Sequence, residues 1–168
     1  MFANTYTVTV TDSNSCIIQH AFIVNQPTAL SITGVVTDVA CNGDSTCAIN
    51  ITASGGTGPL TYLWSTNNTQ EDQTNLPAGV YTVTVTDSIG CTEQQTFTVL
   101  QPNAIVITGI VTDVGCNGAS TGAIDITASG GSATLSYLWS NASTNEDQTN
   151  LFTNIYTVTV TDSLGCTA

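Results

Sequence analysis

The most informative absence in this chain is that of positive charge. Its 168 residues include no Lys or Arg, twelve acidic residues and a single His, so the formal net charge is −12 at pH 7. Nucleic-acid binding is excluded, because no side chain can neutralise phosphates and release their counterions. Attraction to anionic membrane surfaces lacks its usual source. Salt bridges and side-chain cross-links that need Lys are excluded for the same reason.

Catalytic residue patterns and long apolar runs are missing as well. His20 is the only His, and its counterpart in the repeat described below is Gln95, so we interpret His20 as a surface-strand residue. We expect no enzyme activity and no cofactor. The longest apolar runs, such as residues 104–107, are far shorter than the roughly 20 residues that span a bilayer. We therefore expect no membrane insertion in this segment.

What the chain does contain is a repeat. The stretch Tyr-Thr-Val-Thr-Val-Thr-Asp occurs at 6–12, 81–87 and 156–162, each copy 75 residues after the previous one. Residues 29–93 and 104–168 are identical at 44 of 65 positions without a gap. Such self-similarity predicts a repeat architecture.

The repeat predicts three parts. Residues 1–28 are the C-terminal part of a preceding repeat, 29–103 a complete repeat, and 104–168 a second repeat that lacks its last strand. Gln26-Pro27 and Gln101-Pro102 are expected to be short, stiff junctions between them. Met1 aligns with the middle of a repeat, so we interpret the sequence as a segment of a longer protein.

The residue pattern predicts an all-β fold. Tyr81, Val83 and Val85 alternate with Thr, as in a half-buried strand whose apolar side faces a core. Short strands follow one another with turn residues between them and without helical periodicity. A Tyr that begins a strand directly after a corner resembles the tyrosine corner of immunoglobulin-like domains. We therefore predict tandem immunoglobulin-like (PKD-like) β-sandwich repeats of 75 residues, with a left-handed residue at Gly79.

The cysteines predict disulfides. Cys16, Cys91 and Cys166 share one position of the repeat, and Cys41 and Cys116 share another. This suggests one bridge within each repeat, Cys41–Cys91 and Cys116–Cys166. In the loop-entropy model, a disulfide that closes a loop of about 50 residues stabilises the folded state by roughly 4 kcal/mol. Disulfides at this frequency indicate an oxidising, extracellular setting.

Whether the number of strands between the two cysteines is even or odd decides between this pairing and another. Cys41 and Cys91 share an end of the sandwich only if an even number of strands lies between them, and we expect four. A fifth strand between Ser65 and Leu76 would instead place Cys41 near Cys166 of the following repeat. Cys47, whose counterpart is Gly122, is interpreted as a buried thiol, with a bond to Cys41 or a lateral cross-link as alternatives.

The chain resembles a known family at this point. Cys-Asn-Gly at 41–43, Ile-Thr-Ala-Ser-Gly-Gly at 51–56, Tyr-Leu-Trp-Ser at 62–65 and the stretch from Leu76 to Cys91 are similar to the SprB-type repeat. That repeat occurs in very large surface adhesins of gliding Bacteroidetes-type bacteria. The resemblance implies secretion, often by the type IX route, display on the cell surface, and a role in adhesion or gliding. It implies no catalytic residues.

Acidic and hydroxyl residues give candidate ligand and modification sites. Calcium takes six to eight oxygens, and the acids that could converge at repeat junctions are Asp38, Asp87, Asp113 and Asp162. No dense acidic loop is present, and solvated carboxylates are the alternative explanation. Asp-Ser motifs at Ser45, Ser88 and Ser163 resemble the O-glycosylation signal of the same bacteria. Asn67 and Asn141 lie in Asn-x-Ser/Thr patterns.

The function that we expect is structural. Tandem β-sandwiches would form an extracellular rod or spacer on the cell surface, whose partners are the neighbouring repeats and a surface or glycan ligand. One alternative is a self-associating filament of identical chains. Another is a carbohydrate-binding or calcium-dependent binding module.

Overall fold

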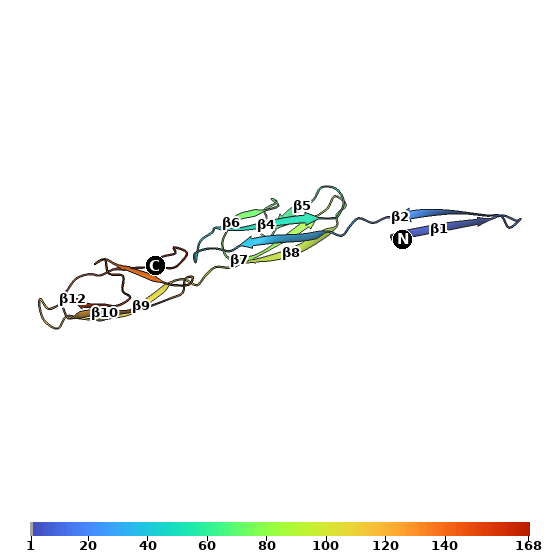
Figure 1. Ribbon diagram of the computed structural model, residues 1–168. Coiled ribbons are helices and arrows are strands. Elements are labelled where there is room, and N and C mark those ends of the chain that lie inside the picture. Colours follow the sequence, from blue (N-terminus) through green and yellow to red (C-terminus); the bar gives the residue numbers. More distant parts are fainter. Residues whose placement is uncertain (1) are drawn as a thin grey trace.

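The computed structural model describes residues 2–168, and every regular element among them is a β-strand. The all-β prediction is therefore confirmed. The strands form a hairpin, a complete repeat and a second repeat, which follow one another along a single long axis (Figure 1). Residues 25–30 and 100–105, which connect these parts, carry no strand. No helix long and apolar enough to cross a membrane occurs among the described residues.

The complete repeat is a sandwich of two three-stranded antiparallel sheets. One sheet has the order β3-β4-β6 and the other the order β5-β7-β8. Their bounds are β3 Ser31–Thr37, β4 Cys47–Ser54, β5 Thr61–Trp64, β6 Gln73–Leu76, β7 Gly79–Thr86 and β8 Thr92–Val99.

The core lies between these two sheets, where the alternation predicted it. Tyr81, Val83 and Val85 of β7 are buried, and the Thr residues between them are only half-buried. Ile49 of β4, in the facing sheet, and Trp64 of β5, which neighbours β7 in the same sheet, are both fully buried. At about 25 cal/mol per Å² of apolar surface, this burial is the main stabilising contribution to the sandwich.

Hydrogen bonds between loops show which ends of the strands lie together at each end of the sandwich. The amide of Gly56 donates to Thr28 O and the amide of Ser88 to Thr57 O, which gathers residues 28–30, 55–58 and 87–91 at one end. We call this the entry end. Val39 N donates to Leu100 O, so β3 and β8 finish together at the opposite, exit end.

β5 and β6 run in the same direction and together cross the sandwich once. β5 pairs with the half of β7 nearest the entry end, with Trp64 opposite Val83. β6 pairs with the half of β4 nearest the exit end, with Leu76 opposite Cys47. The chain therefore changes sheets halfway along one passage. A repeat makes five passages, so the chain enters at one end and leaves at the other.

The loop that changes sheets is held by side-chain hydrogen bonds. The indole N–H of Trp64 donates to Gln70 O at 2.9 Å, and the carboxylate of Asp72 accepts from Ile51 N at 2.9 Å. Buried Gln73 donates to the carbonyls of Gln70 and Asp72. These contacts satisfy buried polar groups that the interrupted ladder leaves open.

The second repeat has the same arrangement over the residues that it contains. Its sheets have the orders β12-β10-β9 and β11-β13. The strands are β9 Val106–Thr112, β10 Gly122–Ser129, β11 Ser136–Trp139, β12 Gln148–Leu151 and β13 Val158–Thr161. A hollow of about 540 Å³, lined in part by Val114, Leu151 and Tyr156, lies at the exit end of the second repeat. In the complete repeat, the corresponding end is covered by the end of β8.

The N-terminal hairpin corresponds to β7 and β8 of the complete repeat. It consists of β1 Asn4–Thr11 and β2 Ile17–Val24. Tyr6 lies opposite Phe22, as Tyr81 lies opposite Phe97. No sheet covers this hairpin among the described residues, and its side chains are exposed or half-buried.

The corner before β7 differs in one respect from the expectation. The hydroxyl of Tyr81 donates to Pro77 O at 2.8 Å, and Tyr6 and Tyr156 make the same bond to the carbonyl four residues earlier. The left-handed residue, however, is Asn75 (φ 57°) and not Gly79. The prediction for Gly79 was wrong, because Gly79 already belongs to the extended strand β7. The immunoglobulin-like assignment itself stays a prediction.

Candidate functional site at the junction of two repeats

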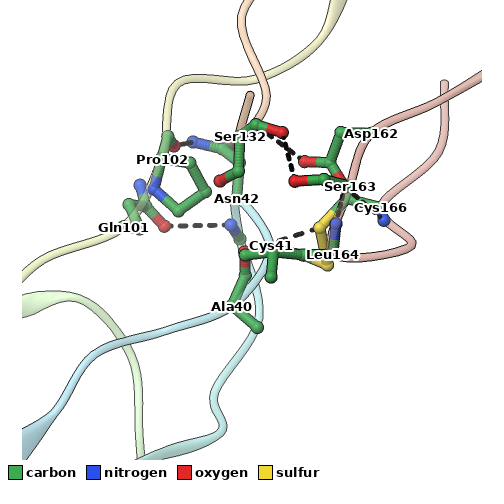
Figure 2. The surroundings of a disulfide bond; sticks show 11 residues. Ala40, Cys41, Asn42, Gln101, Pro102, Ser132, Asp162, Ser163, Leu164 and Cys166 are labelled. Carbon is green, nitrogen blue, oxygen red and sulfur yellow. Dashed lines mark hydrogen bonds between the residues drawn. A yellow bond between two sulfur atoms is a disulfide. The ribbon is translucent and has the colours of Figure 1, made fainter. Parts of the chain in front are cut away.

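The site that the fold brings together is the junction between the complete repeat and the second one. Cys41, in the loop after β3, is joined by a disulfide to Cys166, in the turn after β13 (Figure 2). Their Cα atoms are 5.5 Å apart, although the residues are separated by 125 positions in the sequence. In the loop-entropy model, a disulfide that closes a loop of this length stabilises the folded state by about 5 kcal/mol.

The predicted pairs Cys41–Cys91 and Cys116–Cys166 are wrong. Four strands do lie between Cys41 and Cys91, but β5 and β6 share one passage, so the chain makes three passages and the two cysteines lie at opposite ends. The alternative pairing of Cys41 with Cys166 is the one observed. Among residues 2–168, Cys16, Cys47, Cys91 and Cys116 are free thiols.

Two hydrogen bonds hold the Cys41 loop against the connector between the repeats. The side-chain amide of Asn42 donates to Pro102 O at 2.9 Å, and the amide of Gly43 donates to Gln101 Oε1 at 2.9 Å (Figure 2). Gly43 has a φ of 85°, a conformation that glycine adopts without steric cost. Bonds of this kind contribute about 0.5–1.5 kcal/mol each, so the loop and the connector form one small, specific contact.

The other side of the junction is a turn organised by Asp162. This residue is 6 % exposed, and its carboxylate accepts hydrogen bonds from the amides of Ser132, Leu164 and Cys166 at 2.8–2.9 Å. Burial opposes the charge, but these backbone donors outweigh it and lower the pKa of Asp162. The turn therefore holds the backbone of Cys166 in place for the disulfide.

The calcium candidates are placed as hydrogen-bond acceptors rather than as one cluster. Asp38 accepts from Leu100 N at 2.8 Å, and Asp87 accepts from the amides of Thr57, Ile89 and Cys91. Asp162 and Asp44 line the same hollow of about 350 Å³ at the junction, whereas Asp113 is exposed at the far end of the second repeat. Over residues 2–168, no three His, Cys, Asp or Glu side chains are grouped so as to hold a metal ion. Calcium binding stays a prediction.

The modification candidates are all exposed. Ser45, Asn67 and Asn141 lie in loops, and Ser88 and Ser163 lie in the turns after Asp87 and Asp162. The hydroxyls of Ser88 and Ser163 donate to Thr57 O and Ser132 O at 2.6 and 2.7 Å. A glycan on either oxygen would remove that donor. Glycosylation of these residues stays a prediction.

Cys47 is a fully buried free thiol, as expected. Burial, with a smaller effect of the Asp38 carboxylate, raises the pKa of Cys47. Cys47 is therefore part of the core and not of the junction. A protonated, enclosed thiol of this kind also reacts slowly.

Sequence reasoning missed the roles of Asn42, Gln101 and the Asp162 turn. The signal was present, because Cys-Asn-Gly recurs at 116–118, Gln-Pro at 26–27, and Asp four residues before Cys at Asp12 and Asp87. The sequence predicts that Gln101-Pro102 is a junction between repeats, but it does not connect this junction with the other two motifs. Only the folded chain brings them to one place.

Comparisons with known proteins agree with this organisation. Residues 33–69 and 108–144 match the family model described as SprB repeat. Each match covers the early cysteine of a repeat, Cys41 or Cys116, and the buried Trp that follows it. A comparison with curated proteins gives no match. The family is one of structural repeats and not of enzymes. Two segments of the chain are thus similar to the SprB repeat, and the Cys41–Cys166 disulfide links the two repeats that contain them.

Proposed function

We propose that this chain is a rod-like spacer segment of an extracellular bacterial surface protein that acts in adhesion or gliding. The observation that carries the proposal is the disulfide-linked junction. It joins the exit end of one repeat to the entry end of the next, so repeats add length and not bulk. Such an array suits a part that projects a contact region away from a cell.

The disulfide supports the extracellular location, and the charge of the chain supports the extended shape. A structural disulfide between repeats is typical of an oxidising compartment. The absence of Lys and Arg also leaves no positive charge that would attract nucleic acids or anionic lipids, and the uniform negative charge disfavours collapse of neighbouring segments.

Small-angle X-ray scattering of the whole chain tests the rod. The expected result is an elongated particle whose maximum dimension changes little between low and high salt. A compact particle, with the two repeats folded side by side, would contradict the proposal. Immunodetection on intact cells before and after surface proteolysis would test the location.

A filament of identical chains is the second candidate, and the N-terminal hairpin favours it. Two of its apolar side chains, Ile17 at 65 % and Ile23 at 70 %, are largely exposed, and their counterparts Thr92 and Thr98 are also exposed in the complete repeat. Exposed apolar surface of this kind often marks an interaction site. Sedimentation velocity over a wide range of concentration distinguishes the two candidates, because only a filament former gives faster-sedimenting species as concentration rises.

A further inference from the structure

The chain contains a second copy of the junction surface, and that copy is open. In the occupied junction, the surface that receives the Cys41 loop is formed by Pro102, Ala104, Ile105 and the turn with Cys166. We call such a surface a junction socket and the Cys-Asn-Gly loop a junction loop. At the entry end of the complete repeat, the equivalent residues Pro27, Ala29, Leu30 and Cys91 line a hollow of about 420 Å³.

The cysteine turn of the open socket is held by the same hydrogen bond as that of the occupied one. Cys91 N donates to Asp87 Oδ1 at 2.8 Å, and Cys166 N donates to Asp162 Oδ1 at 2.9 Å. Cys91 is an exposed free thiol. The turn is thus in place before any disulfide forms, and an incoming loop would need little rearrangement of the socket.

A free junction loop is also already in its docked shape. Gly118 has a φ of 80°, against 85° for Gly43 in the occupied junction. Ala119 N donates to Cys116 O at 3.0 Å, and Asp44 N donates to Cys41 O at 3.2 Å. Cys116 is exposed and free, so the loop keeps this shape without a partner.

We propose that the open socket at Cys91 binds the junction loop of another repeat of this type, so that every repeat is disulfide-linked to both of its neighbours. This inference rests on the proposed rod function and specifies its connecting device. By analogy with the occupied junction, the incoming Asn amide donates to Pro27 O and the incoming Gly amide to Gln26 Oε1. The incoming thiol meets Cys91.

The socket determines which of the free thiols forms the disulfide with the incoming loop. Cys16 is an exposed free thiol like Cys91, and its amide donates to Asp12 Oδ1 at 2.9 Å in the same way. The hairpin that carries Cys16 has no connector residues packed beside it among the described residues, however, and therefore no socket. Cys16 is the matched control for a thiol in the right turn without the docking surface.

The covalent step is an exchange with a small disulfide such as oxidised glutathione. The Cys91 thiolate attacks this disulfide, which forms a mixed disulfide and releases one glutathione thiolate. The thiolate of the incoming loop then attacks Cys91 Sγ and releases the second glutathione. Two protein thiols are oxidised, and one disulfide is reduced to two thiols.

The test inserts a second copy of residues 29–103 directly after residue 103 of the whole chain and refolds the product in a glutathione redox buffer. The new junction then offers the Cys41 loop of the first copy to Cys91 of the second copy. Differential alkylation and a non-reducing peptide map are expected to show one disulfide more than in the unextended chain. Cys16 remains alkylated in both.

Two matched variants of the extended chain assign the new bond. Cys91→Ser in the second copy is expected to remove the added disulfide, whereas Cys91→Ser in the first copy is expected to leave both disulfides intact. If the insertion adds no disulfide, or if the first-copy variant is the one that loses it, the inference is overturned. An elongated particle with Cys91 of the second copy still free would overturn the inference alone. A compact particle with both disulfides formed would instead contradict the rod.

Discussion

Three aspartates show how a single residue prepares the junction. Asp12, Asp87 and Asp162 each end a Tyr-Thr-Val-Thr-Val-Thr-Asp stretch, and in each case one carboxylate oxygen accepts the amides two and four residues later. The residue four positions later is a cysteine every time. The carboxylate therefore fixes the backbone from which the thiol projects.

Asp87 should make stability depend on pH. Burial acts against its charge, but amide donors, with Cys91 foremost, lower the pKa of Asp87 below its ordinary value. A lowered folded-state pKa stabilises the fold above about pH 4, the unfolded value, and this contribution is lost as pH falls through the folded pKa. Asp87→Asn should therefore lower the urea midpoint most near neutral pH, and the difference should shrink as pH falls below about 4 toward the folded-state pKa.

Asp125→Asn is the control for this variant. It removes the same charge from an exposed strand position where the first repeat already has Asn50. Its urea midpoint should follow that of the unchanged protein at every pH. Equal effects of the two substitutions would show that net charge, and not the turn, is responsible.

At the scale of elements, the passage shared by β5 and β6 determines the architecture. Had each strand crossed the whole sandwich, the early and late cysteines of one repeat would lie at the same end. Because β5 stops at Trp64 and the chain resumes as β6 in the other sheet, the number of passages is odd. With an odd number of passages, the chain enters and leaves the repeat at opposite ends, so successive repeats follow one another in a line.

The packing of β3 against β8 offers a test of the core. A Cβ at Gly34 would lie 2.8 Å from Phe97 Cε1 and 2.9 Å from Ile51 Cγ2. Gly34→Ala should therefore destabilise the protein by about 1–3 kcal/mol, as overpacking does. Equilibrium urea unfolding measures the change, and adding Phe97→Leu should recover part of it.

Gly115→Ala provides the comparison. A Cβ there would meet only Thr121 Oγ1, at 3.7 Å, so this variant should be neutral or slightly more stable through its effect on the unfolded chain. A Gly34→Ala protein as stable as Gly115→Ala would mean that β3 and β8 are not packed as described.

At the scale of the whole molecule, the disulfide changes how the chain carries tension. Force applied to the two termini passes along β3 to Cys41 and then directly to Cys166. The residues between them, which include the rest of the complete repeat and most of the second one, are outside the loaded path. If neighbouring repeats are linked in the same way, the array resists lengthening even when individual strands detach.

Single-molecule force spectroscopy would measure this effect. With the 125-residue separation and about 3.4 Å per extended residue, reduction or Cys166→Ser should release roughly 400 Å of additional contour length. Cys16→Ser, outside the closed loop, should leave the oxidised extension unchanged. Full-length extension of the oxidised chain would contradict the assigned path.

The repeat, the all-β class and the buried face of β7 could be predicted from the residue pattern. These features depend on local alternation, because successive strand residues point to opposite sides whatever the strand pairs with. The buried Cys47 also followed from sequence, through the usual preference of a cysteine without a counterpart for the core.

Which cysteines meet could not be predicted in this way, because it depends on how the strands are arranged in the folded chain. Four strands between Cys41 and Cys91 were expected and are present, yet the pairing depends on their directions. Those directions are fixed by hydrogen bonds between segments far apart in the chain, such as β4 with β6 and β5 with β7. No local pattern encodes a change of sheet halfway through a passage, and that change placed Cys41 beside Cys166 of the next repeat.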